Sequence, residues 1–301
     1  MSALIETASR IPAPAVAGCV ADLVACGSLE MSADRPQDAR VMAAHLPVGT
    51  KVYVNHLPRL TLDDSLRALG ALREAGLEPV PHLAARRIAS RAEARSFLDR
   101  AVRDAGVSKA LLIGGDEPAP RGPYADGAGL LRDGVLAECS VREVGVPGYP
   151  EGHPRIARAA LEQAFQEKLA LAGAQGLGAF LVTQFSFAPA RVVEYCAELA
   201  RKMPALPVYV GLAGPAETRM LLRFAQRCGV SASLRALQDQ GMAAVRLVMH
   251  TDPGEQLTAV ARYCLAHASC NIVGAHLFSF GAAARAAAWM GEAIGSRRSA
   301  A

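Results

Sequence analysis

The chain has 301 residues, of which 51% are hydrophobic, 20% are charged and 5% are aromatic. A chain so apolar and so mixed in charge is not disordered, and its length suits one large α/β domain or two small ones. Its 32 Lys and Arg residues against 28 Asp and Glu residues give a net charge of +4, without basic runs. This pattern argues against a nucleic-acid partner or an anionic membrane surface.

Seven cysteines, an odd number with no CxxC pair, indicate buried thiols of a reducing compartment rather than a disulfide framework or a metal site. The string that ends at Cys19 is similar to a lipoprotein processing site, but Glu6 and Arg10 interrupt the apolar segment before it. We therefore interpret this region as part of an amphipathic first helix. Because no apolar run reaches the roughly 18 residues of a membrane span, we expect a cytoplasmic protein.

Eight short apolar runs, each bounded by Gly, Pro or polar residues, recur along the chain. Such runs are typical of parallel strands that are buried on both faces. They alternate with helical patterns, and eight such repeats predict a single TIM barrel domain over residues 1–301. A doubly wound open sheet is the alternative. The predicted strands lie at 28–32, 51–57, 79–84, 110–116, 142–150, 180–187, 207–214 and 272–280.

Capping residues mark the starts of several helices. Thr61 with Asp64 predicts the start of one helix, and Ser90 with Glu93 predicts the start of another. Asp252 followed by a proline predicts a third, late helix.

The alternation is interrupted before the last strand. Between residues 211 and 272 the pattern indicates helices around Met220 and Leu234, and the one strand candidate lies at 243–249. We interpret this interval as extra helices before the last strand, and the segment after Ala282 as a final helix.

Polar residues follow the predicted strands, whereas the residues before them are apolar. In a TIM barrel, the carboxyl ends of the strands carry the catalytic residues. Carboxylate, imidazole, phenol and amide groups all occur at these positions, so this end of the barrel is the predicted functional site. The residues are Glu30, Asn55, His56, His82, Asp116, Tyr149, Glu151, His153, Gln184 and Ser279.

The segment IGGDEPAP (113–120) places two glycines and Asp116 after a strand. Glycines there let the backbone approach a planar ligand or a phosphate, and the aspartate can accept hydrogen bonds from a heterocycle. A tight turn in which Asp116 caps a helix explains the segment equally well. The chain has no GxGxxG or P-loop motif, so the dinucleotide and nucleotide sites that depend on those motifs are not supported.

Two further motifs are more specific. In GYPEGHP, the residues Tyr149, Glu151 and His153 alternate with Gly and Pro. A purely structural turn rarely needs all three of these side chains. The alternative is that His153 only caps the next helix. VTQFSF places Gln184 in an apolar run, where its amide must find a ligand or a partner in the core. Lys168, in the helix between them, is either a phosphate ligand or a solvated lysine paired with a glutamate.

The order of these motifs resembles the methylenetetrahydrofolate reductase family. The resemblance runs from about residue 27 to residue 282, and GYPEGHP followed by TQFSF is its most specific part. It implies a TIM barrel that reduces 5,10-methylenetetrahydrofolate to 5-methyltetrahydrofolate with hydride from NAD(P)H, of which we favour NADH. The matching segments are LEM at Glu30, PHLA at His82, GGDEP at Asp116, GYPEGHP at Tyr149, the helix with Lys168, TQFSF at Gln184, VGLAGP at Gly211 and AHLFSF at His276.

The resemblance also implies a role for each matching residue. Glu30 matches the general acid that protonates N10, so that the five-membered ring opens to an iminium. Asp116 matches an aspartate close to the flavin and the pterin. Gln184 matches a glutamine that binds the pterin, with Phe187 beside it, and Gln238 matches a second substrate glutamine. His82, Tyr149 and Lys168 match residues that hold the flavin cofactor, and Asn55, Gly115 and His153 are further candidates on the cofactor side.

Several departures from the family lie on the flavin side. An arginine of typical members is Gly114 here, Asn55 stands for a threonine, and an arginine expected after the last strand aligns with Ala282. Because a diphosphate cofactor usually needs a well-placed cation, we predict weak or absent FAD and direct hydride transfer from the nicotinamide. The alternatives are a folate-dependent methyltransferase or one-carbon protein on the same barrel, and a non-catalytic folate-binding protein. The oligomeric state and the direction of the reaction stay open.

Overall fold

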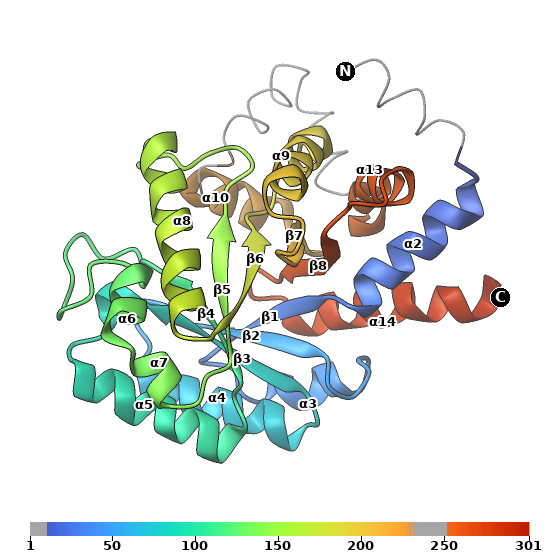
Figure 1. Ribbon diagram of the computed structural model, residues 1–301. Coiled ribbons are helices and arrows are strands. Elements are labelled where there is room, and N and C mark those ends of the chain that lie inside the picture. Colours follow the sequence, from blue (N-terminus) through green and yellow to red (C-terminus); the bar gives the residue numbers. More distant parts are fainter. Residues whose placement is uncertain (1–10, 229, 231–251, 301) are drawn as a thin grey trace. The chain divides into compact units, whose positions relative to one another are not determined.

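The computed structural model describes residues 11–228, 230 and 252–300. Eight parallel strands close into a barrel in the order β1 to β8, and helices alternate with them (Figure 1). The predicted TIM barrel is therefore confirmed, and the open sheet is wrong. The strands are β1 (Ser28–Ser32), β2 (Lys51–Asn55), β3 (Glu78–Ala84), β4 (Lys109–Ile113), β5 (Glu143–Gly148), β6 (Gly178–Thr183), β7 (Val208–Ala213) and β8 (Ile272–Phe278).

Three helices begin at the predicted caps. Thr61 and Asp64 form a capping box at the start of α4, and the Ser90 hydroxyl accepts a hydrogen bond from the Glu93 N–H at the start of α5. Asp252 caps α13. The helices are α2 (Ala13–Ala25), α3 (Asp38–Ala43), α4 (Leu62–Glu74), η1 (Ala85–Arg87), α5 (Arg91–Ala105), α6 (Gly127–Asp133), α7 (Val135–Glu138), α8 (Arg158–Ala174), α9 (Pro189–Lys202), α10 (Thr218–Cys228), α13 (Pro253–Ala266) and α14 (Ala283–Ala300).

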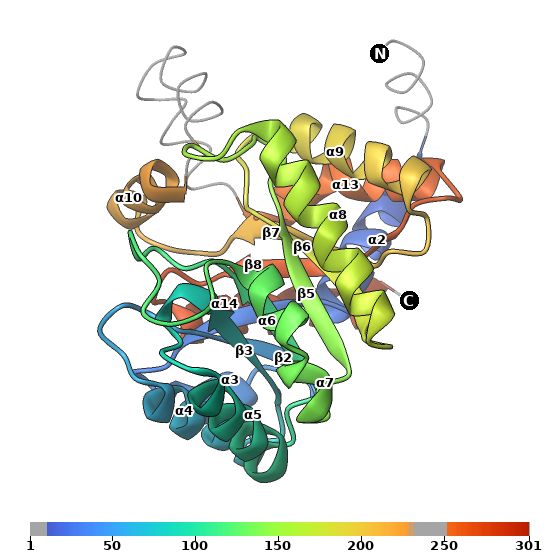
Figure 2. The same ribbon diagram turned by 60° about the vertical axis from the view of Figure 1, so that its left-hand side comes forward.

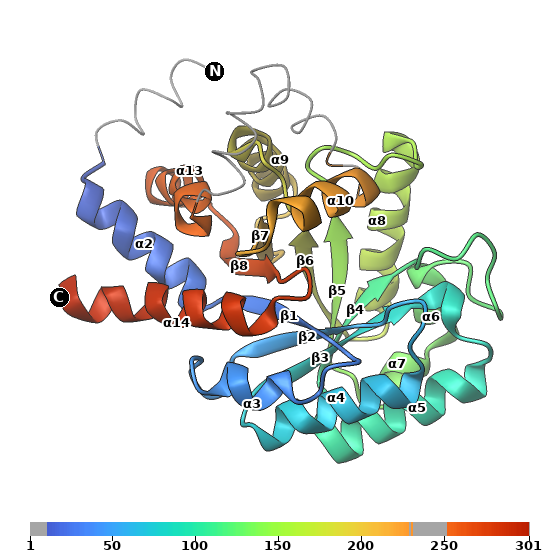
Figure 3. The same cartoon turned by 180° about the vertical axis from the view of Figure 1, so that it is seen from behind.

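The chain divides into two compact units. The first unit contains residues 1–28, 148–154 and 182–301, and the second contains residues 29–147 and 155–181. In the first unit, β7 pairs with β8 in parallel, with Gly211 opposite His276. The helix α2 packs against α13 and α14 (Figure 3).

In the second unit, β2 pairs with β3, β3 with β4, and β4 with β5, all in parallel. The helix α4 packs against β3 and α5, and α6 packs against α8 (Figure 2). Leu69, Leu72 and Leu98 are fully buried on the inner faces of α4 and α5. Burying each of these side chains contributes about 1.5 to 3 kcal/mol, so the amphipathic pattern of these helices stabilises this unit.

Predictions near the chain ends and before the last strand have mixed outcomes. The first and final helices are confirmed as α2 and α14, and the helix near Met220 is confirmed as α10. The predicted helix around Leu234 and the strand at 243–249 lie outside the described residues. Among the helices that the structure describes, none is long and apolar enough to cross a membrane.

Candidate functional site

A buried carboxylate and an imidazole lie together in the second unit. Glu30 is the third residue of β1 and is only 8% exposed, and His82, in β3, is equally buried. The His82 Nε2 lies 3.7 Å from the Glu30 Oε1. The edge of the Tyr53 ring packs against the imidazole, with the ring centroids 5.8 Å apart. This arrangement holds a buried carboxyl group beside an imidazole, on two strands of the barrel wall.

The residue at the end of β2 presents a buried hydrogen-bond acceptor. Asn55 is half-buried, and within the described part of the chain its Oδ1 is buried without a hydrogen-bond partner. A buried amide oxygen without a partner costs stability, so such an atom is a candidate for contact with a ligand. Asn55 was predicted on the cofactor side, and its free acceptor is compatible with that role.

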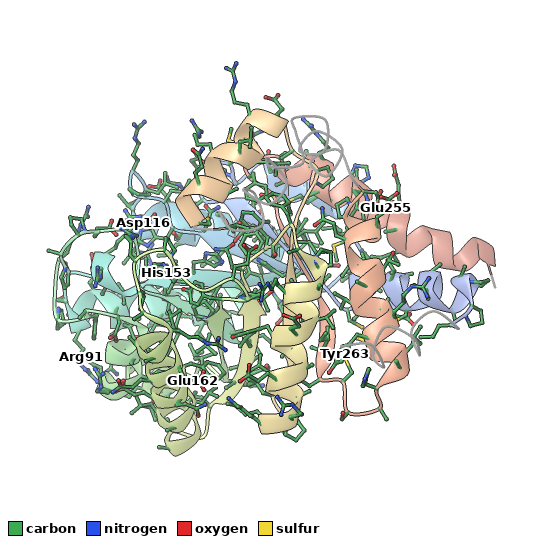
Figure 4. The ribbon with its side chains drawn as sticks, turned by 90° about the horizontal axis from the view of Figure 1, so that it is seen from above. Arg91, Asp116, His153, Glu162, Glu255 and Tyr263 are labelled. Atoms are coloured by element: carbon green, nitrogen blue, oxygen red, sulfur yellow. The ribbon has the colours of Figure 1, made fainter. Side chains whose placement is uncertain are left out.

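The GGDEP segment forms a loop after β4. Gly115 has a φ of +95°, a left-handed conformation that favours glycine, and an added Cβ would lie 3.1 Å from the Glu117 Oε2. Asp116 is exposed on this loop (Figure 4), and its Oδ1 lies 3.7 Å from the Arg155 Nη2. It does not cap a helix, because the next helix, α6, is capped by Asp126. The Asp116 carboxylate is thus accessible to a ligand.

Two consecutive arginines that the sequence analysis did not single out fix the loops around Asp116. Arg87 is buried in η1, and its Nε lies 2.9 Å from the Glu117 carboxylate. Its terminal nitrogens donate to four carbonyl groups of the loop after β2, those of residues 56, 57, 58 and 60. Arg86 donates to the carbonyl groups of Glu117 and Ala125. The only available signal was an RR pair directly after an apolar strand.

His56 lies inside the loop that Arg87 holds. Its Nε2 is 3.2 Å from the Leu60 carbonyl oxygen, and its side chain is buried. Burial, together with the positive charge of Arg87, lowers the pKa of His56 to about 4. His56 is therefore neutral at physiological pH.

Lys168 lies on α8 of the second unit and is half-buried. Burial lowers the pKa of its ammonium group, and the nearby carboxylates of Asp126 and Glu167 oppose this effect. Glu167 itself pairs with Arg132, with 2.7 Å between the Glu167 Oε1 and the Arg132 Nη2. The surroundings of Lys168 thus contain acidic groups, which disfavour an anionic ligand at this position.

In the first unit, the GYPEGHP segment brings two rings together. The Tyr149 and His153 rings meet edge to face, with 5.3 Å between their centroids and an angle of 86°. Burial raises the pKa of Tyr149 to about 12, so its hydroxyl keeps its proton and can donate a hydrogen bond at neutral pH.

The TQFSF segment lies against GYPEGHP in the first unit. The Gln184 N–H donates to the Gly148 carbonyl at 2.8 Å, and the Gln184 Oε1 accepts from the Phe185 N–H at 3.1 Å. The Ser186 hydroxyl donates to the Glu151 Oε1 at 2.6 Å. These contacts join the two motifs and fix the backbone and the side-chain oxygen of Gln184, which leaves its amide N–H groups for another acceptor. The role of Ser186 was not predicted.

Phenylalanines surround this segment. Phe185 packs edge to face against Phe187, Phe278 and Phe280, with centroid distances between 5.2 and 5.8 Å. Phe187 is buried in this cluster, which also contains residues of α10. The first unit contains the predicted residues Tyr149, His153, Gln184 and Phe187, and the second contains Glu30, Asn55, His82, Gly115, Asp116 and Lys168. Gln238 lies outside the described residues.

One comparison with known proteins identifies a family. A family model described as "Methylenetetrahydrofolate reductase" matches residues 60–238, which is more than half of the chain. Among solved structures, dihydropteroate synthase from Thermus thermophilus is similar, with 15% identity, a TM-score of 0.44 and coverage of 91% of this chain and 92% of that one. Triosephosphate isomerase from Bartonella henselae has 9% identity, a TM-score of 0.40 and coverage of 91% and 98%. Structural similarity at this level does not extend to function.

Proposed function

Because the chain belongs to the methylenetetrahydrofolate reductase family, we propose that it reduces 5,10-methylenetetrahydrofolate to 5-methyltetrahydrofolate, or catalyses the reverse reaction, with NAD(P)H. NADH is the favoured donor. Family membership supports a folate one-carbon oxidoreductase in general terms. The observation that carries the specific proposal is the buried Glu30 carboxyl group of β1, which lies 3.7 Å from His82 of β3.

Glu30 is the general acid of the proposed reaction. Its proton goes to N10 of the folate, the bond between N10 and the methylene carbon breaks, and an iminium forms at N5. Hydride from the nicotinamide then adds to the methylene carbon and gives the 5-methyl group and the oxidised nicotinamide. His82 beside the carboxyl group orients Glu30, and the low exposure of both side chains limits the access of water to the proton.

Gln184 and Asp116 are the proposed partners of the pterin. A pterin presents adjacent donors and acceptors, which an amide and a carboxylate complement. The Gln184 Oε1 is occupied by the Phe185 N–H, so its amide N–H groups are the ones that donate to the pterin. The exposed Asp116 accepts hydrogen bonds from pterin N–H groups.

Neither Gly114 nor the pair Arg86 and Arg87 offers a free cation for a tightly held FAD diphosphate. Gly114 supplies no cation. The space beside it would admit a side chain, because an added Cβ would meet nothing within 4 Å. Arg86 and Arg87 are committed to carbonyl groups and to Glu117. Burial lowers the pKa of Lys168, and acidic side chains lie near it. These contacts support direct hydride transfer from the nicotinamide to the folate iminium, without bound FAD.

The test is an assay of NADH oxidation with 5,10-methylenetetrahydrofolate on protein whose absorbance spectrum is recorded after dialysis. The proposal predicts turnover without flavin absorbance. Glu30→Gln should lose most turnover, by about 10²-fold or more, because general acid catalysis contributes about that factor, and it should still bind folate. The matched change Glu143→Gln, at the amino end of β5, should leave turnover unchanged.

Other outcomes contradict specific parts of this proposal. Undiminished activity of Glu30→Gln would exclude Glu30 as the acid. Stoichiometric flavin that survives dialysis would exclude the direct transfer. Folate binding without NADH or NADPH consumption would instead indicate a methyltransferase, another one-carbon protein or a non-catalytic folate-binding protein.

A further inference from the structure

Two cysteines of the first unit lie in contact, far along the chain from the GYPEGHP and TQFSF motifs. Cys264 is in the last turn of α13, and Cys270 is in the short connection between α13 and β8. Their Sγ atoms are hydrogen-bonded at 2.9 Å. Both side chains are half-buried free thiols, so a small reagent can reach them. We propose that Cys264 and Cys270 form a reversible disulfide when the protein meets a peroxide.

The connection that carries Cys270 is held in place by local contacts. The Cys270 N–H donates to the His267 carbonyl at 3.0 Å, and the His267 ring stacks on Tyr263, whose place on α13 is labelled in Figure 4. The next residue, Asn271, donates through its side-chain nitrogen to the carbonyl groups of Met203 and Leu206. Because both sides of Cys270 are anchored, the two sulfur atoms are held in contact. Disulfide formation therefore costs little further conformational entropy.

The two thiols differ in their acidity, which assigns their roles. The hydrogen bond between the two sulfur atoms lowers the pKa of Cys270, and a hydrogen bond from the Ile272 N–H adds to this effect. The same contact raises the pKa of Cys264. The lowered pKa makes Cys270 the thiol of the pair that more readily forms a thiolate at neutral pH. Cys270 is the attacking thiolate, and Cys264 is the thiol that resolves the product.

Two neighbouring cysteines are poor alternatives. Cys196 on α9 is fully buried, and burial raises its pKa to about 12. Cys19 on α2 donates to the Ala261 carbonyl at 3.8 Å, and burial raises its pKa too. Neither is ionised at neutral pH, so both are slow to react with a peroxide.

The chemistry has two steps. The Cys270 thiolate attacks one oxygen of hydrogen peroxide, the O–O bond breaks, and hydroxide leaves and is protonated to water. The product is a sulfenic acid at Cys270. The Cys264 sulfur then attacks the Cys270 sulfur, the S–O bond breaks, and a second water leaves with the Cys264 proton. Two thiols and one peroxide thus give one disulfide and two waters, and an added dithiol reverses the change.

The chain offers a direct readout of this bond. Trypsin releases both cysteines in a single peptide, residues 263–285, between Arg262 and Arg285. The full-length protein is treated with hydrogen peroxide at neutral pH, quenched, denatured and alkylated. We expect peptide 263–285 to lose both alkyl groups and about two mass units relative to the reduced form, and dithiothreitol to restore the alkylation.

Variants separate the proposed roles. Cys264→Ser removes the resolving thiol, so Cys270 should accumulate as a sulfenic acid that dimedone traps. The matched change Cys19→Ser should leave disulfide formation within peptide 263–285 unchanged. The proposal is overturned if wild-type peptide 263–285 stays fully alkylated after peroxide, if Cys270 becomes linked to Cys19, or if Cys270 in Cys264→Ser gives no dimedone adduct. The wild-type result decides the question even if a variant does not fold, and it does not depend on the proposed catalytic activity.

Discussion

Arg87 shows how one buried side chain organises a loop of the candidate site. Its guanidinium binds four carbonyl groups after β2 and the Glu117 carboxylate next to Asp116. Arginine suits this role because its planar fork presents five donors and stays charged when buried. Typical family members have an arginine where this chain has Gly114. Arg86 and Arg87 do not replace that arginine, because their donors bind groups within the protein.

Replacing Arg87 should be costly. Arg87→Met leaves a buried carboxylate and several carbonyl groups without their donor, and breaking a buried ion pair in this way costs about 3 to 5 kcal/mol of unfolding free energy. Urea unfolding measures the loss. The matched change Arg91→Met removes pairs with Asp133 and Glu138 from an arginine that is 43% exposed, and should cause a much smaller loss. Equal losses in the two variants would contradict the structural role of Arg87.

At the scale of the elements, the sequence predicted those features that depend on residues close together in the chain. The start of α4 was predicted because Thr61 and Asp64 bond to each other within one helical turn. The conformation of the loop just before α4 was not predicted, because it is held by Arg87, about thirty residues further along the chain. The bond from Ser186 to Glu151 likewise spans 35 residues, and neither residue type reveals its partner. The sequence therefore indicates where elements begin, but not which distant side chains fix the loops.

The loop after β2 should also respond to acid through His56. Its pKa is about 4 in the folded protein against 6.5 ordinarily, so the unfolded chain binds this proton more strongly. Stability is then lost as the pH falls from 6.5 towards 4, by about 2 kcal/mol between about pH 7 and pH 5. Urea unfolding at both pH values should show this loss in the wild type and a smaller one in His56→Gln. The exposed His45→Gln should match the wild type, and an unchanged pH dependence in His56→Gln would exclude His56 as the cause.

At the scale of the whole molecule, the barrel was predictable because its eight strands are buried on both faces and therefore appear as continuous apolar runs. All eight predicted strands are present, in sequence order around a closed barrel. Asn55, Asp116, Tyr149 and Gln184 were found at or after the strand ends because polar groups stand out after such runs. Contacts among them, such as that of Glu30 with His82, depend on the register of neighbouring strands, which no single run reveals.

Ligand binding should stabilise the whole protein and separate binding from catalysis. A ligand that binds only the folded state adds about 2.7 kcal/mol at a hundred times its dissociation constant, which thermal unfolding detects as a higher Tm. Methyltetrahydrofolate should produce this shift in the wild type and in Glu30→Gln. Gln184→Ala should lose the shift, because it removes the amide that donates to the pterin, whereas the exposed Gln163→Ala should keep it. FAD at the same concentration should leave the Tm unchanged, and a shift with FAD as large as that with folate would contradict the proposal of flavin-free hydride transfer.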